Sequence, residues 1–356
     1  MKLIELHILQ SFPVSCLNRD DVGAPKTAVF GGVNRARLSS QSLKRAIREH
    51  AAELLPARFA GERTKLIVGP LQAALQKHGI ADATLALDHA KNIADILAKL
   101  DPKASAEDPK VGTLTFLAPS EIEAIAAEAA AIISGSPKAK EYEKFLDKAC
   151  KKAGLLDGAD IALFGRMVAS LPSLTLEGAA MFSHALSTHR ADNDLDFYTA
   201  VDDRKPAGDD AGAGMMGTLE FASAVYYRYA ALNLDLLADA AHLGKLTPAE
   251  RAEIVDTFIR AALMAVPGAR KNSMNANTLP GYVLGTFKAK GQPVQLVNAF
   301  EQPVAARNGL LAASRKALEE HHAALKSTWG LKVDTEIALP DSNLDAFCAA
   351  LTRHVC

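Results

Sequence analysis

The spacing of apolar side chains predicts a strand at the beginning of the sequence and a helix that begins near residue 39. Residues 2–9 are rich in Leu and Ile, a composition typical of a buried strand. From Ser39 or Ser40, either of which can cap a helix, apolar side chains recur at helical spacing as far as Leu54. Residues 10–38 show no sustained period, so we expect a long loop there, and loops of that length are often functional.

The rest of the chain continues this mixture of helices and strands. Residues 60–160 are mostly helical by their apolar spacing, and residues 160–164 are predicted to be a strand. Residues 190–217 are acidic, rich in glycine and poor in large aliphatic side chains, which indicates a protruding loop or a small subdomain. We expect further strands at 218–229, 281–288, 293–299 and 331–338, and further helices at 247–266, 308–327 and 342–353. This order favours an α+β core that carries insertions over a regularly alternating doubly wound α/β fold.

Composition and charge exclude several classes of protein. The 356 residues are 49% hydrophobic and 23% charged, as in ordinary globular proteins, and the formal net charge is −1. A uniformly basic nucleic-acid-binding protein is therefore excluded, although a local basic surface is not. The four cysteines show neither disulfide nor zinc-ligand spacing, and no apolar run reaches the length of a membrane span. We therefore expect a cytoplasmic protein that is not bound to a membrane and holds no metal or other cofactor.

Positive charge is concentrated in one segment. Between Arg19 and Arg48 the sequence has seven basic residues and two acidic ones. On the predicted helix, Gln41, Lys44, Arg45 and Arg48 follow one another at i, i+3, i+4 and i+7 and share one face. Free amides at the helix start, serine hydroxyls and long cationic side chains together suit a chain of phosphates. The alternative is a basic helix face that is merely solvated.

Two adjacent aromatic residues, Phe197 and Tyr198, stand out in the acidic segment. Aromatic side chains in such a segment have little core to join. They are suited to stacking on nucleic-acid bases, which is tolerant of sequence, or to anchoring the segment on a neighbouring subunit. The acidic residues around them also suit Mg²⁺, although exposed loops are often acidic simply for solubility.

Two further pairs of residues follow the ends of predicted elements. Arg166 and Met167 come directly after the predicted strand at 160–164 and could contact a phosphate and a base, or could be a surface cation beside a core side chain. Arg270 and Lys271 follow a Pro-Gly helix stop and could contact a backbone phosphate, or could be ordinary residues of a helix exit.

Signals for catalysis are weak. Residues 212–217 match the GxGxxG pattern, but a polar loop precedes them and a strand-like run follows, so the context of a dinucleotide site is missing. His184 and His189 lie five residues apart and form no recognisable triad. Asp20 and Asp21 form an acidic pair within the basic segment and are better suited to ordering its arginines than to acid–base chemistry.

Several blocks of the sequence resemble one known family. They are Ser15–Asp21, Phe30–Gly32, Arg37–Arg45, Asp160–Met167, Asp194–Asp203, Gly217–Ala230 and Val266–Ala269. Together they resemble the CasC family, the backbone subunit of the type I-E CRISPR surveillance complex Cascade. The blocks span most of the chain in the order that the family has, and residues 55–155 match only weakly.

The resemblance implies a fold and a function. It implies an RRM-like (ferredoxin-like) palm from residues 1–57, 156–191 and 218–356, a helical fingers insertion at 58–155, and a thumb at 192–217. It also implies that several copies stack head to tail along the guide RNA (crRNA), where each thumb displaces one nucleotide at a regular interval. The guide would then pair with target DNA. The family is not enzymatic, and its partners are the other Cascade subunits and a recruited helicase-nuclease.

The residues and the resemblance together give a set of candidate RNA-binding residues. These are Asn18, Arg19, Lys26, Ser39, Gln41, Lys44, Arg45, Arg48, Arg166, Met167, Phe197, Tyr198, Arg270 and Lys271. Two other functions remain as alternatives. One is a metal-dependent ribonuclease that uses Asp20 or Asp21, as in related CRISPR backbone subunits. The other is a nucleotide-dependent enzyme that uses the glycines at 212–217.

Overall fold

The computed structural model describes residues 1–105, 107–133, 139–200, 215–305 and 309–356. An antiparallel sheet forms its centre, in the order β11-β10-β1-β9-β7-β3-β2, and β6 and β8 also pair with β9. The strands are β1 (Leu3–Ser15), β2 (Thr27–Phe30), β3 (Val33–Leu38), β6 (Ala180–Phe182), β7 (Ala185–Ser187), β8 (Asp194–Ala200), β9 (Met215–Asn233), β10 (Tyr282–Lys288) and β11 (Thr335–Leu339).

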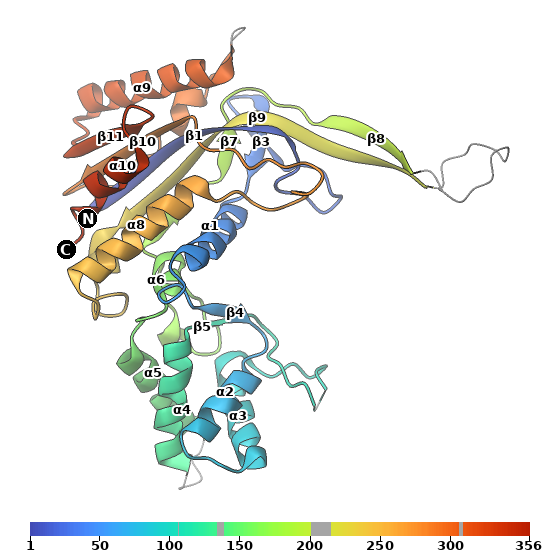
Figure 1. Cartoon of the computed structure of the whole chain (residues 1–356), viewed down its shortest axis with the longest axis vertical. Coiled ribbons are helices and arrows are strands. Elements are labelled where there is room, and N and C mark those ends of the chain that lie inside the picture. The colour runs from blue at the N-terminus through green and yellow to red at the C-terminus, as the bar shows by residue number, and fades with distance from the viewer. Residues whose placement is uncertain (106, 134–138, 201–214, 306–308) are drawn as a thin grey trace, which may run out of the picture.

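Helices cover both faces of this sheet (Figure 1). Alternate side chains of β1 explain why, since Ile4, Leu6 and Ile8 pack into one hydrophobic core and Leu3 and Leu9 into another. The first core is closed by helices from several parts of the chain, and the second by α9. The helices of the first core are α1 (Ser40–Leu54), α6 (Ala159–Phe164), α7 (Leu234–Leu237), α8 (Pro248–Met264) and α10 (Leu344–Thr352), and α9 spans Leu310–Trp329.

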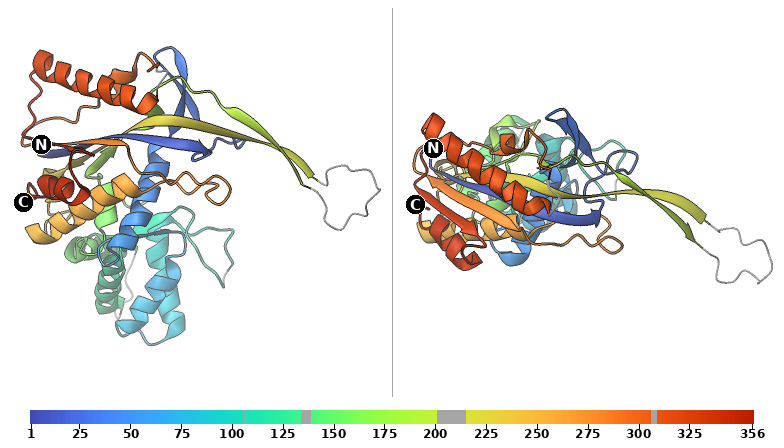
Figure 2. Two further views of the ribbon diagram at one scale, coloured as in Figure 1. Left: turned by 45° about the horizontal axis from the view of Figure 1, so that its top comes forward. Right: turned by 90° about the horizontal axis from the view of Figure 1, so that it is seen from above.

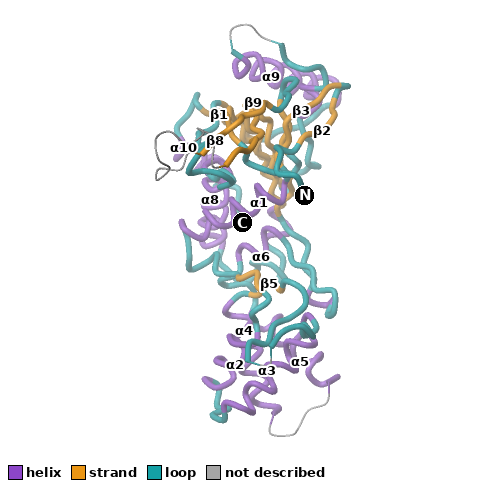
Figure 3. The backbone as a smooth tube through the Cα atoms, turned by 90° about the vertical axis from the view of Figure 1, so that its right-hand side faces the viewer, coloured by secondary structure: helices purple, strands orange, loops and turns teal. Residues whose placement is uncertain are grey.

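A helical insertion with a core of its own lies between α1 and α6 (Figures 1 and 3). Its helix α3 (Ala83–Ala98) buries Ala86, Ala90, Ile93 and Leu97, which recur every three or four residues on one face. The other elements are β4 (Glu62–Thr64), α2 (Val68–Lys77), β5 (Thr115–Leu117), α4 (Pro119–Ile133) and α5 (Ala139–Ala153). The predominantly helical character predicted for this part of the chain is therefore observed.

A two-stranded arm projects from the sheet (Figure 2). It consists of β8 and the beginning of β9, paired so that Phe197 lies opposite Thr218 and Tyr198 opposite Gly217. A Cβ atom at Gly217 would come within 2.5 Å of the Tyr198 hydroxyl, so the missing side chain lets the tyrosine ring lie across the neighbouring strand. A protrusion was predicted here, as a loop or a small subdomain. Residues 201–214, with the first three residues of the glycine motif, lie outside the described residues.

Three predicted elements are wrong. Residues 160–164 are not a strand but lie in α6, because a short, fully buried apolar run fits either structure. Residues 10–38 are not one loop, since β1 continues to Ser15 and β2 and β3 form a hairpin. Its turn is Gly31-Gly32, where both residues have positive φ, the conformation that tight hairpin turns require.

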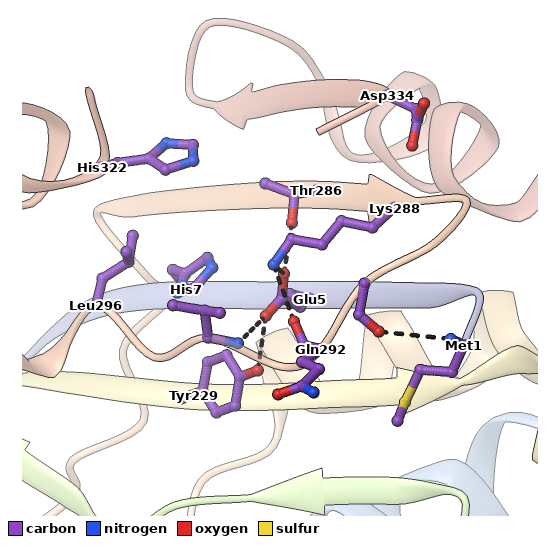
Figure 4. Close-up of polar contacts among 12 residues, drawn as sticks. Met1, Glu5, His7, Tyr229, Thr286, Lys288, Gln292, Leu296, His322 and Asp334 are labelled. Atoms are coloured by element: carbon purple, nitrogen blue, oxygen red, sulfur yellow. Dashed lines mark hydrogen bonds and ion pairs between the residues drawn. The ribbon is translucent and has the colours of Figure 1, made fainter. Parts of the chain in front are cut away.

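The third wrong prediction is the strand at 293–299, which is a loop that ends in a 3₁₀ helix (Val297–Phe300). Buried side chains of the sheet bind its backbone instead of a neighbouring strand. Glu5 accepts from the Val294 amide at 2.7 Å and forms a 2.5 Å ion pair with Lys288 (Figure 4). The Tyr227 hydroxyl accepts from the Leu296 amide at 2.9 Å.

Candidate nucleic-acid interface

The cationic residues that the sequence predicts to bind RNA, apart from Arg166, lie on α1 or on segments close to it. The loop at 16–26 and the loop at 265–277 both lie beside this helix, since Arg19, Ser42 and Ala269 line one cleft and Leu17, His50 and Lys271 line another. We call α1 together with these flanking segments the basic face. Its cations lie on more than one side of the helix, since Lys271 shares a cleft with His50, whereas Lys44 and Arg48 lie over Phe182 and Phe116. The cations are Arg19, Lys26, Arg37, Lys44, Arg45, Arg48, Arg270 and Lys271.

These cations are mostly without a carboxylate partner. Of these eight cations, only Arg45 forms an ion pair with a described residue, Glu49, at 2.7 Å. Lys44 and Arg48 instead lie over aromatic rings, each 5.3 Å from the centre of Phe182 or Phe116 respectively. A ring fixes the position of a cation without neutralising it, so the charge stays available to an anion. Burial lowers the pKa of Lys44.

The loop at 16–26 is ordered by its own polar side chains. The Asp20 carboxylate accepts from the amides of Val22 at 3.0 Å and Ala24 at 2.9 Å, which closes a tight turn. The Asn18 side-chain carbonyl accepts from the Ser39 amide at 2.9 Å and so ties the loop to the start of α1. Asp20 therefore orders the backbone of its own loop, whereas the acidic pair was expected to order the arginines of the segment; no ion pair between either aspartate and an arginine is found among the described residues.

The start of α1 differs from the expectation of free amides and hydroxyls. Ser39 is buried, and its hydroxyl accepts from the Ser42 amide at 3.3 Å as the N-cap. The Ser40 amide donates to Nδ1 of His184 at 2.9 Å. Because these groups are already hydrogen-bonded within the protein, Ser39 is a structural cap, and an anion on this surface would be bound chiefly by side chains.

The proposal that Arg166 contacts a phosphate is corrected by its position inside the protein. Its guanidinium donates to both carboxylate oxygens of Glu121, at 2.9 and 2.7 Å, and to the carbonyl oxygens of Leu174 and Phe116. Both members of this ion pair are buried. Arg166 thus joins the segment after α6 to the start of α4. Its neighbour Met167 is 82% exposed.

The two aromatic residues of the arm lie on opposite faces. Neighbouring residues of a strand alternate, so Phe197 shares a face with Leu195 and Met216, whereas Tyr198 shares a face with Asp194 and Asp196. Phe197 is 63% exposed and Tyr198 36% exposed. The two rings therefore cannot stack on one ligand from the same side. The apolar side chains of Leu195, Phe197 and Met216 on the Phe197 face are exposed.

Two polar residues of this surface were absent from the predicted set. Arg37 follows the β2–β3 turn, and its place in the basic segment between Arg19 and Arg48 was a signal that could have included it. His184 lies in the turn between β6 and β7, 144 residues from its partner Ser40. No local pattern in the sequence could have revealed that contact.

The fold and this surface define an α+β protein with an antiparallel sheet, a helical insertion, a projecting arm and a basic face. The chain belongs to the family described as CT1975-like protein, whose model matches residues 4–350.

Two solved structures are similar over nearly the whole length. One, titled "CRISPR RNA-guided surveillance complex, pre-nicking", has a TM-score of 0.79 and 29% identity, covering 99% of this chain and 100% of that chain. The other, titled "CRISPR RNA-guided surveillance complex", has a TM-score of 0.68 and 26% identity, covering 99% of each chain. Comparison with curated proteins gives no match.

Two features are absent from the described residues. No helix there is long and apolar enough to cross a membrane. In the same part of the chain, no group of three or more His, Cys, Asp or Glu side chains is arranged to hold a metal ion.

Proposed function

We propose that this protein is the guide-RNA-binding backbone subunit of a type I-E CRISPR surveillance complex, acting without catalysis. The similar structures come from RNA-guided surveillance complexes and match this chain from end to end, which supports a role of the same kind. The basic face holds the sugar-phosphate backbone of crRNA. Neighbouring copies of the chain and the other Cascade subunits complete the assembly.

The observation that carries the proposal is the set of cations without carboxylate partners on the basic face. Seven of its eight cations form no ion pair within the described residues. Lysine and arginine contacts to phosphates carry no sequence information. A subunit that binds the guide must do so without sequence preference, because the guide sequence varies and base pairing supplies the specificity for target DNA.

The arm supplies the contact between copies. A contact between the arm of one copy and the body of the next joins two different surfaces. Such a heterologous contact, when it does not close the copies into a ring, generates an open filament, here along the RNA. The Phe197 face presents the exposed apolar side chains of Leu195, Phe197 and Met216 beside Thr199 and Thr218, and it suits stacking on a base. The face of Tyr198 carries Asp194 and Asp196 and suits the cations of the neighbouring copy. The arm inserted between RNA and neighbour then displaces one nucleotide per copy.

The ribonuclease alternative is disfavoured by the geometry of one of its two candidate residues. Asp20 holds the turn of its own loop with two amide hydrogen bonds. The alternative of a nucleotide-dependent enzyme is also disfavoured. A dinucleotide-binding glycine motif is followed by a helix, whereas Gly217 lies within β9, which continues as a strand.

Assembly on RNA of increasing length tests the proposal. Mass measurements of purified protein with two unrelated single-stranded RNAs are expected to show a number of bound copies that rises in proportion to RNA length. The RNA should stay intact in the presence of Mg²⁺ or Mn²⁺. No binding to either RNA would contradict the proposal, and cleavage that is lost in Asp21→Ala would establish the ribonuclease instead.

A further inference from the structure

His184 occupies a defined position on the basic face. It lies between β6 and β7, and its Nδ1 accepts a hydrogen bond from the Ser40 amide at the start of α1, at 2.9 Å. A backbone N–H can only donate, so Nδ1 carries no proton. A neutral imidazole that accepts at Nδ1 has its proton on Nε2.

The surroundings favour this neutral form. Burial, Arg37 and Lys26 together lower the pKa of His184. His184 is an exposed residue. Within the described residues its Nε2 forms no hydrogen bond. Nε2–H is therefore a donor open to solvent on a surface that also presents Arg37 and Lys26.

His189, five residues later, differs in this respect. Its Nδ1 lies 2.7 Å from the Arg190 carbonyl oxygen, and its Nε2 accepts from the Val225 amide at 3.2 Å. Both of its nitrogens are thus used inside the protein. His184 uses one nitrogen to hold α1 and leaves the other free, which is the arrangement expected of a residue that also binds a ligand.

We propose that His184 is a further RNA-contact residue, whose Nε2–H donates to a phosphate oxygen of the guide beside Lys26 and Arg37. The inference rests on the proposed RNA-binding function. The lysines and arginines of the basic face supply charge on long side chains, whereas the imidazole ring, tied to α1, supplies a donor of fixed position. Because the ring is neutral, its contact adds affinity without releasing an additional counterion.

Two substitutions separate the two roles of His184. In His184→Asn the side-chain oxygen stands near the place of Nδ1 and can accept from Ser40, but the outer donor is lost. In His184→Gln the amide nitrogen stands near the place of Nε2 and can donate, but the inner acceptor is lost. Each variant and wild type are tested for binding of single-stranded RNA across a salt series and for thermal stability.

The expected result is specific. His184→Asn should melt like wild type and bind RNA about tenfold more weakly, the size of one hydrogen bond to a charged group, with an unchanged log–log salt slope. His184→Gln should bind RNA more tightly than His184→Asn. Wild-type affinity in His184→Asn, or a slope flatter by about 0.7, would overturn the inference. Failure of the wild type to bind RNA would instead refute the proposed function itself.

Discussion

Replacement of Arg166 by methionine should destabilise the protein without a direct effect on RNA binding. The substitution removes a buried guanidinium that donates twice to Glu121 and also to two backbone carbonyls. Among the described residues, Glu121, which is 1% exposed, would keep only the Ala118 amide at 3.0 Å as a donor. Removal of one partner from a buried ion pair costs about 3–5 kcal/mol. We expect a loss of that size in the free energy of unfolding of Arg166→Met.

Urea denaturation followed by far-ultraviolet circular dichroism measures this loss. Helix content is the appropriate signal, because the single tryptophan, Trp329, is 79% exposed on α9 and far from the ion pair in sequence. The double variant Glu121→Gln with Arg166→Met is the control, and it should lose less than Arg166→Met because no unpaired charge stays buried. A stable Arg166→Met variant with weaker RNA binding and a flatter salt slope would refute this reasoning and place the guanidinium on the RNA.

Three further outcomes are expected. Phe197→Ala should weaken RNA binding by about 1–3 kcal/mol by titration, whereas Tyr198→Ala, on the opposite face of the arm, should leave it unchanged; an equal loss in both would contradict the assignment of faces. Burial raises the pKa of Asp160 to about 6, so the folded chain holds a proton that the unfolded chain releases near pH 4, and stability falls as pH rises between these values. Relative to wild type, Asp160→Asn should therefore gain about 2.4 kcal/mol in unfolding free energy between pH 4 and pH 7, and a constant difference would refute this. Arg35→Met leaves four carbonyl oxygens without their buried donor and should cost about 3 kcal/mol or more in urea denaturation, and a loss below about 1 kcal/mol would count against it.

Local patterns sufficed to predict several elements. The helix that begins at Thr247 was predicted from its sequence, and the structure shows the full capping box between Thr247 and Glu250. The helix that begins at Ser39 and the first strand were predicted for similar reasons, since their apolar spacing is regular. The pair Gly31-Gly32 is also a local signal, since two consecutive glycines are typical of the tight turn of a hairpin such as β2–β3.

Other features depend on contacts that no local pattern contains. The strand predicted at 293–299 failed because Glu5, Tyr227 and Arg35, all distant in sequence, bind the backbone of that segment and its neighbours. The candidate interface could be predicted from sequence only where its cations follow one another in a single segment, as they do in α1. Arg166 was misplaced because an arginine that pairs with a buried carboxylate cannot be distinguished in sequence from one on the surface.

The most direct test of the account is the salt dependence of RNA binding in a variant that lacks two cations of the basic face. Lys44→Ala combined with Arg48→Ala removes two cations that lie on aromatic rings without carboxylate partners among the described residues. Lys316→Ala combined with Lys332→Ala, on α9 and just after it, is the matched control. For single strands each lost phosphate contact flattens the log–log salt slope by about 0.7.

The account predicts a slope flatter by about 1.4 and weaker binding in the Lys44 and Arg48 variant, with the same values for unrelated RNA sequences. It predicts no change in the control. An unchanged slope in the variant, or an equal change in the control, would contradict the claim that the basic face holds the guide.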